Sequence, residues 1–197
     1  MRKKNTRDTK GRIISAAWEL FYEQGYEKTT VDEIIELSET SKGSFYHYFN
    51  SKDALLGTLA YMFDRKYEEI EPNLAGYETN FEKLIYLNRE LFAMIEDSIS
   101  LELLARLFST QLVTRGEKHL LDRNRYYYRL LRKICADGQV CGEFRTDLSV
   151  NDLTKLYALV ERAMMYDWCI CNGEYSLTRY AEENISGLLS GLKAKNE

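Results

Sequence analysis

The segment TSKGSFYHYFNSK, residues 40–52, places four aromatic residues and two lysines around a single glycine. Phe45 and Phe49 are four positions apart, so in a helix both side chains lie on the same face. We therefore predict a helix over residues 41–49 that buries both phenylalanines. Its exposed side is expected to hold Gly43, Ser44, Tyr46 and His47. A small aromatic core would account for the phenylalanines but not for the exposed residues.

The residues before this segment predict two more helices. The first has Asp8 or Thr9 as its cap and Gly25 as a left-handed stop. Its apolar residues recur at helical spacing and are Ile13, Ile14, Ala17, Leu20 and Phe21. In TTVDEIIEL, Thr30 and Glu33 have the spacing of a capping box, which begins a second helix. From this helix we expect Ile34 and Leu37 to face inward.

A fourth helix is expected after the quoted segment. It begins at Asn50 or Ser51 and runs towards Pro72 without a break, with Leu55, Leu59 and Phe63 along one stripe. The second and third helices are short, are joined by a turn and are braced by a longer first helix. This arrangement is a helix-turn-helix.

Charge is distributed unevenly along the chain. The formal net charge is −4, yet residues 1–53 hold equal numbers of cationic and acidic side chains, so the excess acidity lies in the second part. Residues 1–12 carry six Lys and Arg against Asp8 alone, a basic arm that suits a phosphate backbone; a solvated tail is the alternative. Gly43 would let the helix start approach a phosphate closely. Lys52, in the first turn of the fourth helix, is unfavourable to the helix dipole unless a negative group such as DNA lies beside it.

At these residues the sequence resembles the N-terminal domain of the TetR family of bacterial transcriptional regulators. The family pattern reads LF, GY and TT at the end of the first helix, isoleucine in the second, and then S.G..Y.[HY]F..K..L. The matching residues here are Leu20, Phe21, Gly25, Tyr26, Thr29, Thr30, Ile34, Ser41, Gly43, Tyr46, Tyr48, Phe49, Lys52 and Leu55. The resemblance implies an all-helical homodimer whose third helix enters the DNA major groove and whose larger C-terminal domain binds a small-molecule effector.

The resemblance also implies which residues contact an operator of double-stranded DNA. Thr30, Tyr46 and Lys52 would hold the phosphate backbone, while Lys42, Ser44 and His47 would read bases. The full DNA-facing set is Thr30, Ser41, Lys42, Gly43, Ser44, Tyr46, His47 and Lys52. The expected DNA-binding domain covers residues 1–53, including the basic arm 1–12. It is joined through the fourth helix to an effector-binding and dimerisation domain over residues 54–197.

The sequence departs from the family pattern in two places. The turn between the second and third helices commonly reads Ala-Gly-Val, but here it is Ser38, Glu39 and Thr40. A glutamate at the positive φ that glycine allows would cost about 1 kcal/mol or more, so either the turn is built differently or the strain is tolerated. Ile35 replaces the usual alanine, which predicts slightly wider packing of the second helix against the third.

Beyond Pro72, helical periodicity supports the interpretation. One apolar stripe consists of Leu84, Leu87, Leu91, Met94 and Ile95, and another lies within residues 101–113. We expect a long central helix over residues 117–140, because its apolar residues cover more than one face. A turn at Gly142 then leads to two final helices, over residues 151–172 and 175–192.

The final helix is predicted to form a dimer interface. Its apolar seam consists of Leu177, Ala181, Ile185, Leu188 and Leu192, and Gly187 and Gly191 allow another backbone to approach. This suits a four-helix interface with two helices from each subunit, as the resemblance also implies; an intrachain core helix is the alternative. A palindromic operator needs two recognition helices about 34 Å apart, which favours the dimer.

The preceding helix, LYALVERAMMYDWC, is predicted to line the effector pocket. The residues expected to face the ligand are Tyr157, Glu161, Met165 and Trp168. One carboxylate among aromatic and thioether groups suits an aromatic or cationic effector. The alternative is a core stripe in which Glu161 pairs with an arginine. Control by a partner protein instead of a ligand is a further alternative, which the absence of a cavity would favour.

Other classes of protein find little support in the sequence. There is no Ser/His/Asp set, metal-ligand spacing or phosphate loop, so we expect neither an enzyme nor a cofactor or metal. Cys135, Cys141, Cys169 and Cys171 are expected to be thiols, and C-x-C is not the spacing of a zinc or redox site. With no signal peptide and no long apolar run, a cytoplasmic protein without a membrane span is expected.

Overall fold

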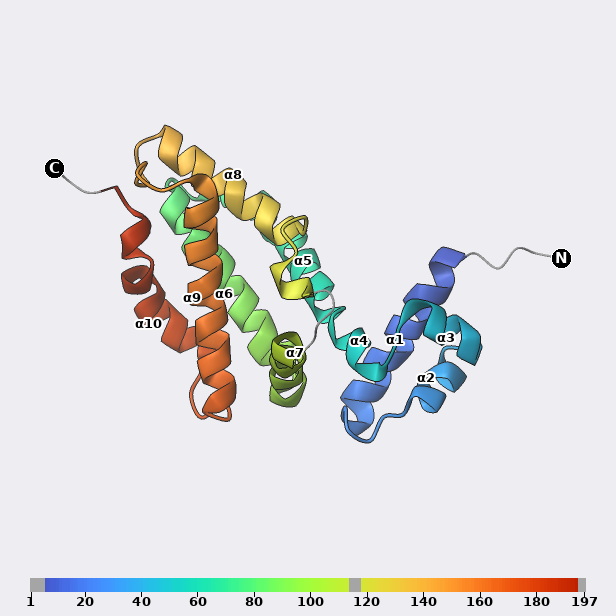
Figure 1. The fold of residues 1–197 in the computed structure, drawn as a ribbon. Coiled ribbons are helices and arrows are strands. Elements are labelled where there is room, and N and C mark those ends of the chain that lie inside the picture. The colour runs from blue at the N-terminus through green and yellow to red at the C-terminus, as the bar shows by residue number, and fades with distance from the viewer. Residues whose placement is uncertain (1–5, 114–117, 195–197) are drawn as a thin grey trace. The chain divides into compact units, whose positions relative to one another are not determined.

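The computed structural model describes residues 6–113 and 118–194. The secondary structure of these residues is helical, as the all-α prediction requires (Figure 1). None of the helices in this part of the chain has the length and apolar character needed to cross a bilayer. The chain divides into two compact units, unit 1 (Met1–Ala60 with Arg106–Leu120) and unit 2 (Tyr61–Ala105 with Leu121–Glu197). The predicted functional boundary at residue 53 stays a prediction.

Unit 1 packs its N-terminal helices around a small apolar core. Its N-terminal helices are α1 (Thr6–Gln24), α2 (Val31–Leu37), α3 (Lys42–Tyr48) and α4 (Lys52–Leu56). The core residues include Ile13, Ala17, Phe21, Ile34, Phe45, Phe49, Leu55 and Leu56. The predicted inward positions of Ile34, Phe45 and Phe49 are confirmed, whereas that of Leu37 is wrong because its side chain is 43% exposed.

The expected unbroken fourth helix is interrupted. α4 ends at Leu56, and α5 (Leu59–Ile70) begins after a turn at Gly57 and Thr58. The Thr58 hydroxyl donates to the carbonyl of Leu55 over 2.6 Å and accepts from the indole of Trp18 over 2.9 Å. Because Thr58 N–H also bonds to Leu55, three residues back, the turn is tighter than an α-helix.

Unit 2 is a bundle in which α6 packs against α8 and α10, and α9 packs against α8 and α10. Its elements, in chain order, are α5, the 3-10 turn η1 (Glu71–Gly76), α6 (Asn80–Ser98), the first turn of α7 (Leu101–Val113), α8 (Tyr126–Val140), α9 (Val150–Ile170), α10 (Leu177–Leu188) and η3 (Ser190–Leu192). A further 3-10 turn, η2 (His119–Leu121), precedes α8.

The expected long helix over residues 117–140 is also shorter in the structure, where α8 begins at Tyr126. Residue 117 lies outside the described residues. The buried guanidinium of Arg125 bonds to both carboxylate oxygens of Asp64, at 3.1 and 2.9 Å. Asp64 also accepts the backbone N–H of Tyr127 over 3.2 Å, so a side chain from α5 satisfies the first turn of α8. This cap holds Arg125 in a non-helical conformation, which stops the helix from extending backwards.

The predicted dimer seam on α10 requires a correction. Leu177, Ala181, Ile185 and Leu192 are buried inside the chain's own core, and of the five predicted residues only Leu188 is exposed, at 54%. α10 packs chiefly against α6, which explains why its apolar side faces inward. The alternative, an intrachain core helix, is therefore the correct interpretation of these four residues.

Candidate functional sites

The start of α2 is held by a reciprocal pair of hydrogen bonds. The hydroxyl of Thr30 accepts the backbone N–H of Glu33 over 3.2 Å, and the Glu33 carboxylate accepts the backbone N–H of Thr30 over 2.7 Å. The predicted capping box is thus confirmed. The backbone hydrogen bond from Thr30, followed by that from its hydroxyl, lowers the pKa of the Glu33 carboxyl. Thr30 is at the surface, where a phosphate could reach it, and the contact to phosphate stays a prediction.

The turn between α2 and α3 contains the strained residue expected from the sequence. Glu39 has φ of 50°, which places it in the left-handed region. Its backbone N–H bonds to the carbonyl of Glu36 over 3.0 Å, and that of Thr40 bonds to Ile35 over 3.1 Å. Ser38 then bonds to Thr40 through their hydroxyls at 2.8 Å. The family's usual turn is therefore kept with glutamate in the glycine position.

α3 presents the predicted set of residues on its outer side. Phe45 is fully buried and Phe49 nearly so, with ring centroids 6.0 Å apart. On the opposite side, Tyr46 is 47% exposed. Other exposed or half-buried members of the set are Ser41, Lys42, Gly43, Ser44 and His47. A Cβ added to Gly43 would meet only the Ser41 hydroxyl, at 3.9 Å, so this surface is open to an approaching partner.

Two side chains at the start of α3 are held in place by neighbours. The Ser41 hydroxyl accepts the backbone N–H of Ser44 over 3.0 Å and caps the helix. The ammonium of Lys42 lies 3.6 Å from a carboxylate oxygen of Asp32, and both side chains are largely exposed. An exposed ion pair of this kind contributes only about 0–1 kcal/mol, so Lys42 can exchange Asp32 for another anion at little cost.

The surroundings of Lys52 differ from the prediction, in which DNA supplies the negative group beside its ammonium. Its ammonium donates to the carbonyls of Tyr26 and Thr29, at 2.6 and 2.8 Å, and lies 4.2 Å from the centroid of the Tyr26 ring. The phenol of Tyr26 bonds in turn to Asp53. Protein groups therefore supply the negative neighbours that the first turn of α4 needs, and a phosphate contact by Lys52 stays a prediction.

The predicted basic arm is only partly within the described chain. Residues 1–5, with three of its cations, lie outside the described residues. Of the rest, Lys10 lies 5.9 Å from the centroid of the Phe49 ring, and Arg12 donates to the carbonyl of Glu39 over 3.4 Å. α1 thus carries two of the arm's cations to the turn and the end of α3.

The predicted pocket residues Tyr157 and Glu161 meet in the core of unit 2. The buried Glu161 carboxylate accepts hydrogen bonds from Tyr67 on α5, Tyr127 on α8 and Tyr157 on α9, at 3.2, 2.6 and 3.1 Å respectively. Asn88 on α6 adds a longer bond of 3.4 Å. Burial raises the pKa of the Glu161 carboxyl, although these hydrogen bonds oppose the shift. Glu161 is therefore paired with tyrosines and not with an arginine.

The other two predicted pocket residues have different surroundings. Met165 and Trp168 are buried, and the indole N–H of Trp168 donates to the carbonyl of Tyr175 over 2.8 Å. Gly173, in the turn after α9, has a φ of 69°. A Cβ added to Gly173 would lie 3.6 Å from the Trp168 ring. Trp168 thus helps to hold the turn between α9 and α10. An effector at Tyr157, Glu161, Met165 and Trp168 stays a prediction.

One surface was missed by the sequence interpretation. Apolar side chains at spacings of three and four residues lie exposed along α9, and they are Leu156, Leu159, Ala163, Tyr166 and Ile170. Leu159 and Ile170 are 52% and 60% exposed. The same helix buries Tyr157, Glu161 and Met164, so both of its faces are apolar. That pattern was visible in the sequence, but we gave a role only to the side with Tyr157, Glu161, Met165 and Trp168.

Comparison with known proteins places this geometry in context. Residues 13–59 match the family described as bacterial regulatory proteins, tetR family. The HTH-type transcriptional regulator QacR of Staphylococcus aureus is 28% identical over 183 residues, which cover 90% of this chain and 88% of that protein.

Two solved structures have a similar fold. Thermus thermophilus FadR, a transcriptional repressor in complex with lauroyl-CoA, has a TM-score of 0.75 and 25% identity, with coverage of 95% of this chain and 96% of that one. FadR from Bacillus subtilis in complex with stearoyl-CoA has a TM-score of 0.68 and 22% identity, with coverage of 93% and 99%. The relatives named here are transcriptional regulators.

Proposed function

We propose that this chain, whose residues 13–59 match the tetR family of bacterial regulatory proteins, represses transcription by binding a palindromic operator as a homodimer, and that a small-molecule effector releases it. The observation that carries this proposal is the exposed face of α3 in unit 1. Phe45 and Phe49 anchor that helix in the core, and its outer side exposes Lys42, Gly43, Tyr46 and His47. A helix presented in this way can enter a major groove.

The exposed groups are suited to the two tasks of DNA binding. We propose that Lys42 and His47 read base edges while Thr30 and Tyr46 bond to phosphates. The Tyr46 phenol is on the exposed side of α3, and its ring packs edge-on against Phe45 at 5.3 Å, so its position is fixed by the core. Lys42 is paired with Asp32 at the surface, and both side chains are largely exposed.

Operator binding can be measured by fluorescence anisotropy on DNA from the gene's own promoter region. We expect the logarithm of affinity to fall linearly with the logarithm of salt concentration. Lys42→Ala should reduce discrimination among operator variants by about 1–3 kcal/mol if the lysine reads a guanine. As a matched control, Lys133→Ala on α8 removes an exposed lysine from unit 2 and should leave discrimination unchanged. An absence of binding to any promoter fragment at low salt contradicts the proposal.

We propose that the homodimer forms through the exposed apolar residues of α9, which replace the seam first predicted on α10. The stripe is continuous, because Leu156, Leu159, Ala163, Tyr166 and Ile170 follow helical spacing. Leu188 and Tyr180 on α10 are also exposed, at 54% and 44%. Apolar patches of this kind on a soluble domain mark interaction surfaces, and α9 with α10 from two copies would make a four-helix interface.

The dimer proposal is tested by sedimentation. Leu159→Glu combined with Ile170→Glu should convert the dimer to a monomer and weaken operator binding, because a monomer contacts one half-site only. Val140→Glu is the control, since Val140 is 89% exposed at the end of α8 and lies outside the stripe. If the double variant sediments as a dimer, the interface lies elsewhere. If the unaltered protein is a monomer at micromolar concentration, the homodimer proposal itself is wrong.

The proposed effector is a small molecule bound by unit 2. The lauroyl-CoA in the Thermus thermophilus repressor supports control by a ligand, as does the fold similarity of the two proteins, which extends over 95% of this chain. Control by another protein is the competing proposal. A thermal-shift screen of metabolites, followed by operator release, distinguishes the two: a compound that raises the melting temperature and weakens operator binding supports ligand control.

A further inference from the structure

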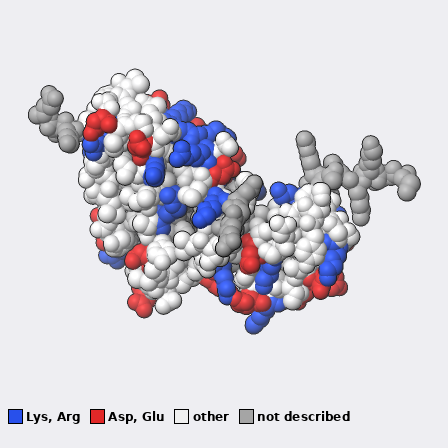
Figure 2. Space-filling model, viewed as in Figure 1, with Lys and Arg blue, Asp and Glu red and all other residues white. Residues whose placement is uncertain are grey.

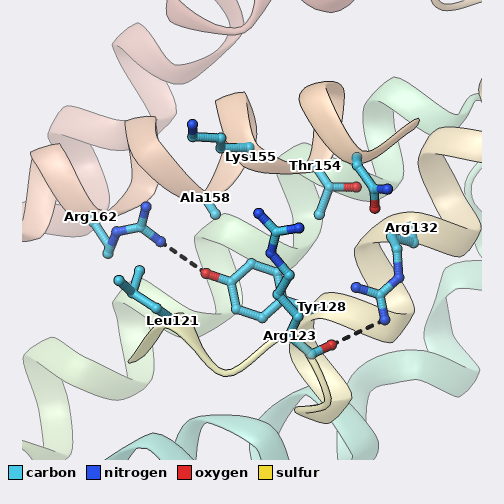
Figure 3. Close-up of a pocket in the computed structure, with 9 residues that line it drawn as sticks. Leu121, Arg123, Tyr128, Arg132, Thr154, Lys155, Ala158 and Arg162 are labelled. Atoms are coloured by element: carbon cyan, nitrogen blue, oxygen red, sulfur yellow. Dashed lines mark hydrogen bonds between the residues drawn. The ribbon is translucent and has the colours of Figure 1, made fainter. Parts of the chain in front are cut away.

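Unit 2 contains a pocket of about 180 Å³ between α8, α9 and the segment that precedes α8. Four cationic side chains line it (Figure 3): Arg123, Arg132, Lys155 and Arg162. They come from different elements, because Lys155 and Arg162 belong to α9, Arg132 to α8 and Arg123 to the preceding segment. Figure 2 shows Lys and Arg side chains gathered over this part of unit 2.

Among the described residues that line the pocket, none is acidic. In the part of the chain that the structure describes, none of the four forms an ion pair within 4.0 Å, whereas Arg125 pairs with Asp64 and Lys133 with Glu71. Among the described acids, Asp152 interacts with two of these cations, because its pKa is lowered chiefly by its hydrogen bond with Ser149 and further by the charges of Lys155 and Arg123. Asp152 is engaged with Ser149 over 2.6 Å as part of the cap of α9.

Two of the arginines are held ready by neutral acceptors. Arg162 donates to the hydroxyl of Tyr128 over 3.2 Å, and Arg132 donates to the backbone carbonyl of Arg123 over 3.1 Å (Figure 3). Each of these bonds uses one of the five N–H groups of a guanidinium, so the others are available to a ligand. Both arginines are partly buried, which limits screening and the entropy lost on binding.

The floor of the pocket is uncharged. Tyr128, Thr154 and Ala158 are buried there, and the Thr154 hydroxyl donates to the carbonyl of Val150 over 2.8 Å. The pocket is smaller than the roughly 300 Å³ typical of a site that encloses a whole drug-sized ligand. It therefore suits a compact anionic group, with the rest of a larger molecule outside.

We propose that this pocket binds the diphosphate group of a small organic phosphate. Four cations exceed what a single carboxylate can neutralise, whereas a diphosphate carries several negative charges. The planar fork of arginine also matches the spacing of phosphate oxygens, and Arg132 and Arg162 provide such forks from opposite walls. This site lies wholly in unit 2, and its test does not depend on operator binding.

Isothermal titration calorimetry on the full-length protein, at fixed ionic strength, tests the assignment with three probes: ADP, inorganic pyrophosphate and hexanoate. We expect ADP and pyrophosphate to bind and hexanoate not to bind. ADP binding tighter than pyrophosphate indicates an organic ligand whose body contacts the rim. Pyrophosphate binding with no binding of ADP overturns the organic class, and hexanoate binding as tight as ADP overturns the phosphate class.

Variants locate the binding within the pocket. Arg132→Gln and Arg162→Gln should each weaken ADP binding about tenfold or more, because each removes charge-assisted hydrogen bonds. Arg162→Lys should restore part of the affinity. Arg129→Gln is the matched control on α8, since Arg129 is exposed and donates to the carbonyl of Asn124 outside the pocket.

Folding of the variants is checked by thermal unfolding. Should Arg132→Gln or Arg162→Gln unfold, the pair Arg123→Gln and Lys155→Gln replaces them, because both side chains are exposed and their removal disturbs no buried contact. Equal ADP affinity of the unaltered protein and a folded pocket variant overturns the inference. Operator affinity is expected to be the same in all of these variants, so a failure here is separate from any failure of the proposed function.

Discussion

The ammonium nitrogen of Lys52 lies 2.6 Å from the carbonyl oxygen of Tyr26 and 4.2 Å from the centroid of the same residue's ring. One cation therefore fastens the start of α4 to the loop between α1 and α2. Its second carbonyl partner, Thr29, immediately precedes the cap of α2. Lys52 thus fixes the position of the helix-turn-helix relative to the helix that follows it.

Replacement of this lysine should affect stability more than the salt dependence of DNA binding. We expect Lys52→Met to lower the free energy of unfolding by about 1–3 kcal/mol, because two charge-assisted hydrogen bonds are lost. Urea denaturation measures this change. The slope of log operator affinity against log salt should stay nearly constant. A slope smaller by about one unit, with stability unchanged, would instead make Lys52 a phosphate contact.

The strained turn offers a stabilising substitution. Glutamate in the left-handed conformation costs about 1–2 kcal/mol, and Glu39→Gly removes this cost. Part of that gain is offset because glycine has greater conformational freedom in the unfolded chain. We expect a net gain of about 0.5–1 kcal/mol in urea denaturation. Glu36→Gly is the control, because Glu36 is in α2 and glycine there should cost about 1 kcal/mol. Loss of stability in Glu39→Gly would show that the contact of Arg12 with the Glu39 carboxylate outweighs the strain.

The junction between α4 and α5 depends on the absence of a side chain at Gly57. A Cβ there would lie 2.2 Å from Cδ2 of His119, closer than any real contact. We expect Gly57→Ala to destabilise unit 1 by about 1–3 kcal/mol, measured by thermal unfolding. His119→Ala in the same background should recover most of the loss. If the two substitutions are simply additive, the clash is not the cause.

The Glu161 carboxyl makes stability depend on pH in a defined direction. Burial raises its pKa above the ordinary value, so the folded protein holds this proton more tightly than the unfolded chain. Between the ordinary pKa of about 4.3 and the raised value, stability therefore falls as pH rises, by about 1.4 kcal/mol for each unit of the shift. Below the ordinary pKa this loss is absent.

Glu161→Gln removes the titrating group while it keeps an acceptor for the tyrosine hydroxyls. The difference in unfolding free energy between the unaltered protein and Glu161→Gln, measured in urea from about pH 4 to pH 8, should grow in favour of the variant as pH rises. Tyr157→Phe is a second test, because it removes one hydrogen bond to the Glu161 carboxylate. The pKa of that carboxyl should rise further, so the loss of stability should extend to higher pH. A difference that does not vary with pH contradicts this account.

Local features of unit 1 were predictable because they depend on residues close in the sequence. The capping box of Thr30 and Glu33, and the shared face of Phe45 and Phe49, involve neighbours three and four positions apart. The strain at Glu39 was equally local. These features determined the position and the exposed side of α3, which is most of the candidate DNA interface.

Features that depend on distant residues were not predictable. α8 begins at Tyr126 because Asp64, on another helix, caps it, and no pattern near residue 126 indicates that partner. Periodicity found the apolar side of α10 but could not tell whether the chain itself or a second copy covers it. The carbonyl partners of Lys52 were not predictable for the same reason, since they lie more than twenty positions away.

The hydrogen bonds around Glu161 also determine how the helices of unit 2 can slide past one another. Donors from α5, α6 and α8 converge on one carboxylate of α9, so each helix has a single register in which its donor reaches that group. A slip of one turn, about 5.4 Å, would carry a tyrosine hydroxyl beyond bonding distance and leave a buried polar group unsatisfied. That penalty is roughly 2–7 kcal/mol for each neutral group without a partner. A leucine bundle would permit such slips, whereas this acid selects one alignment.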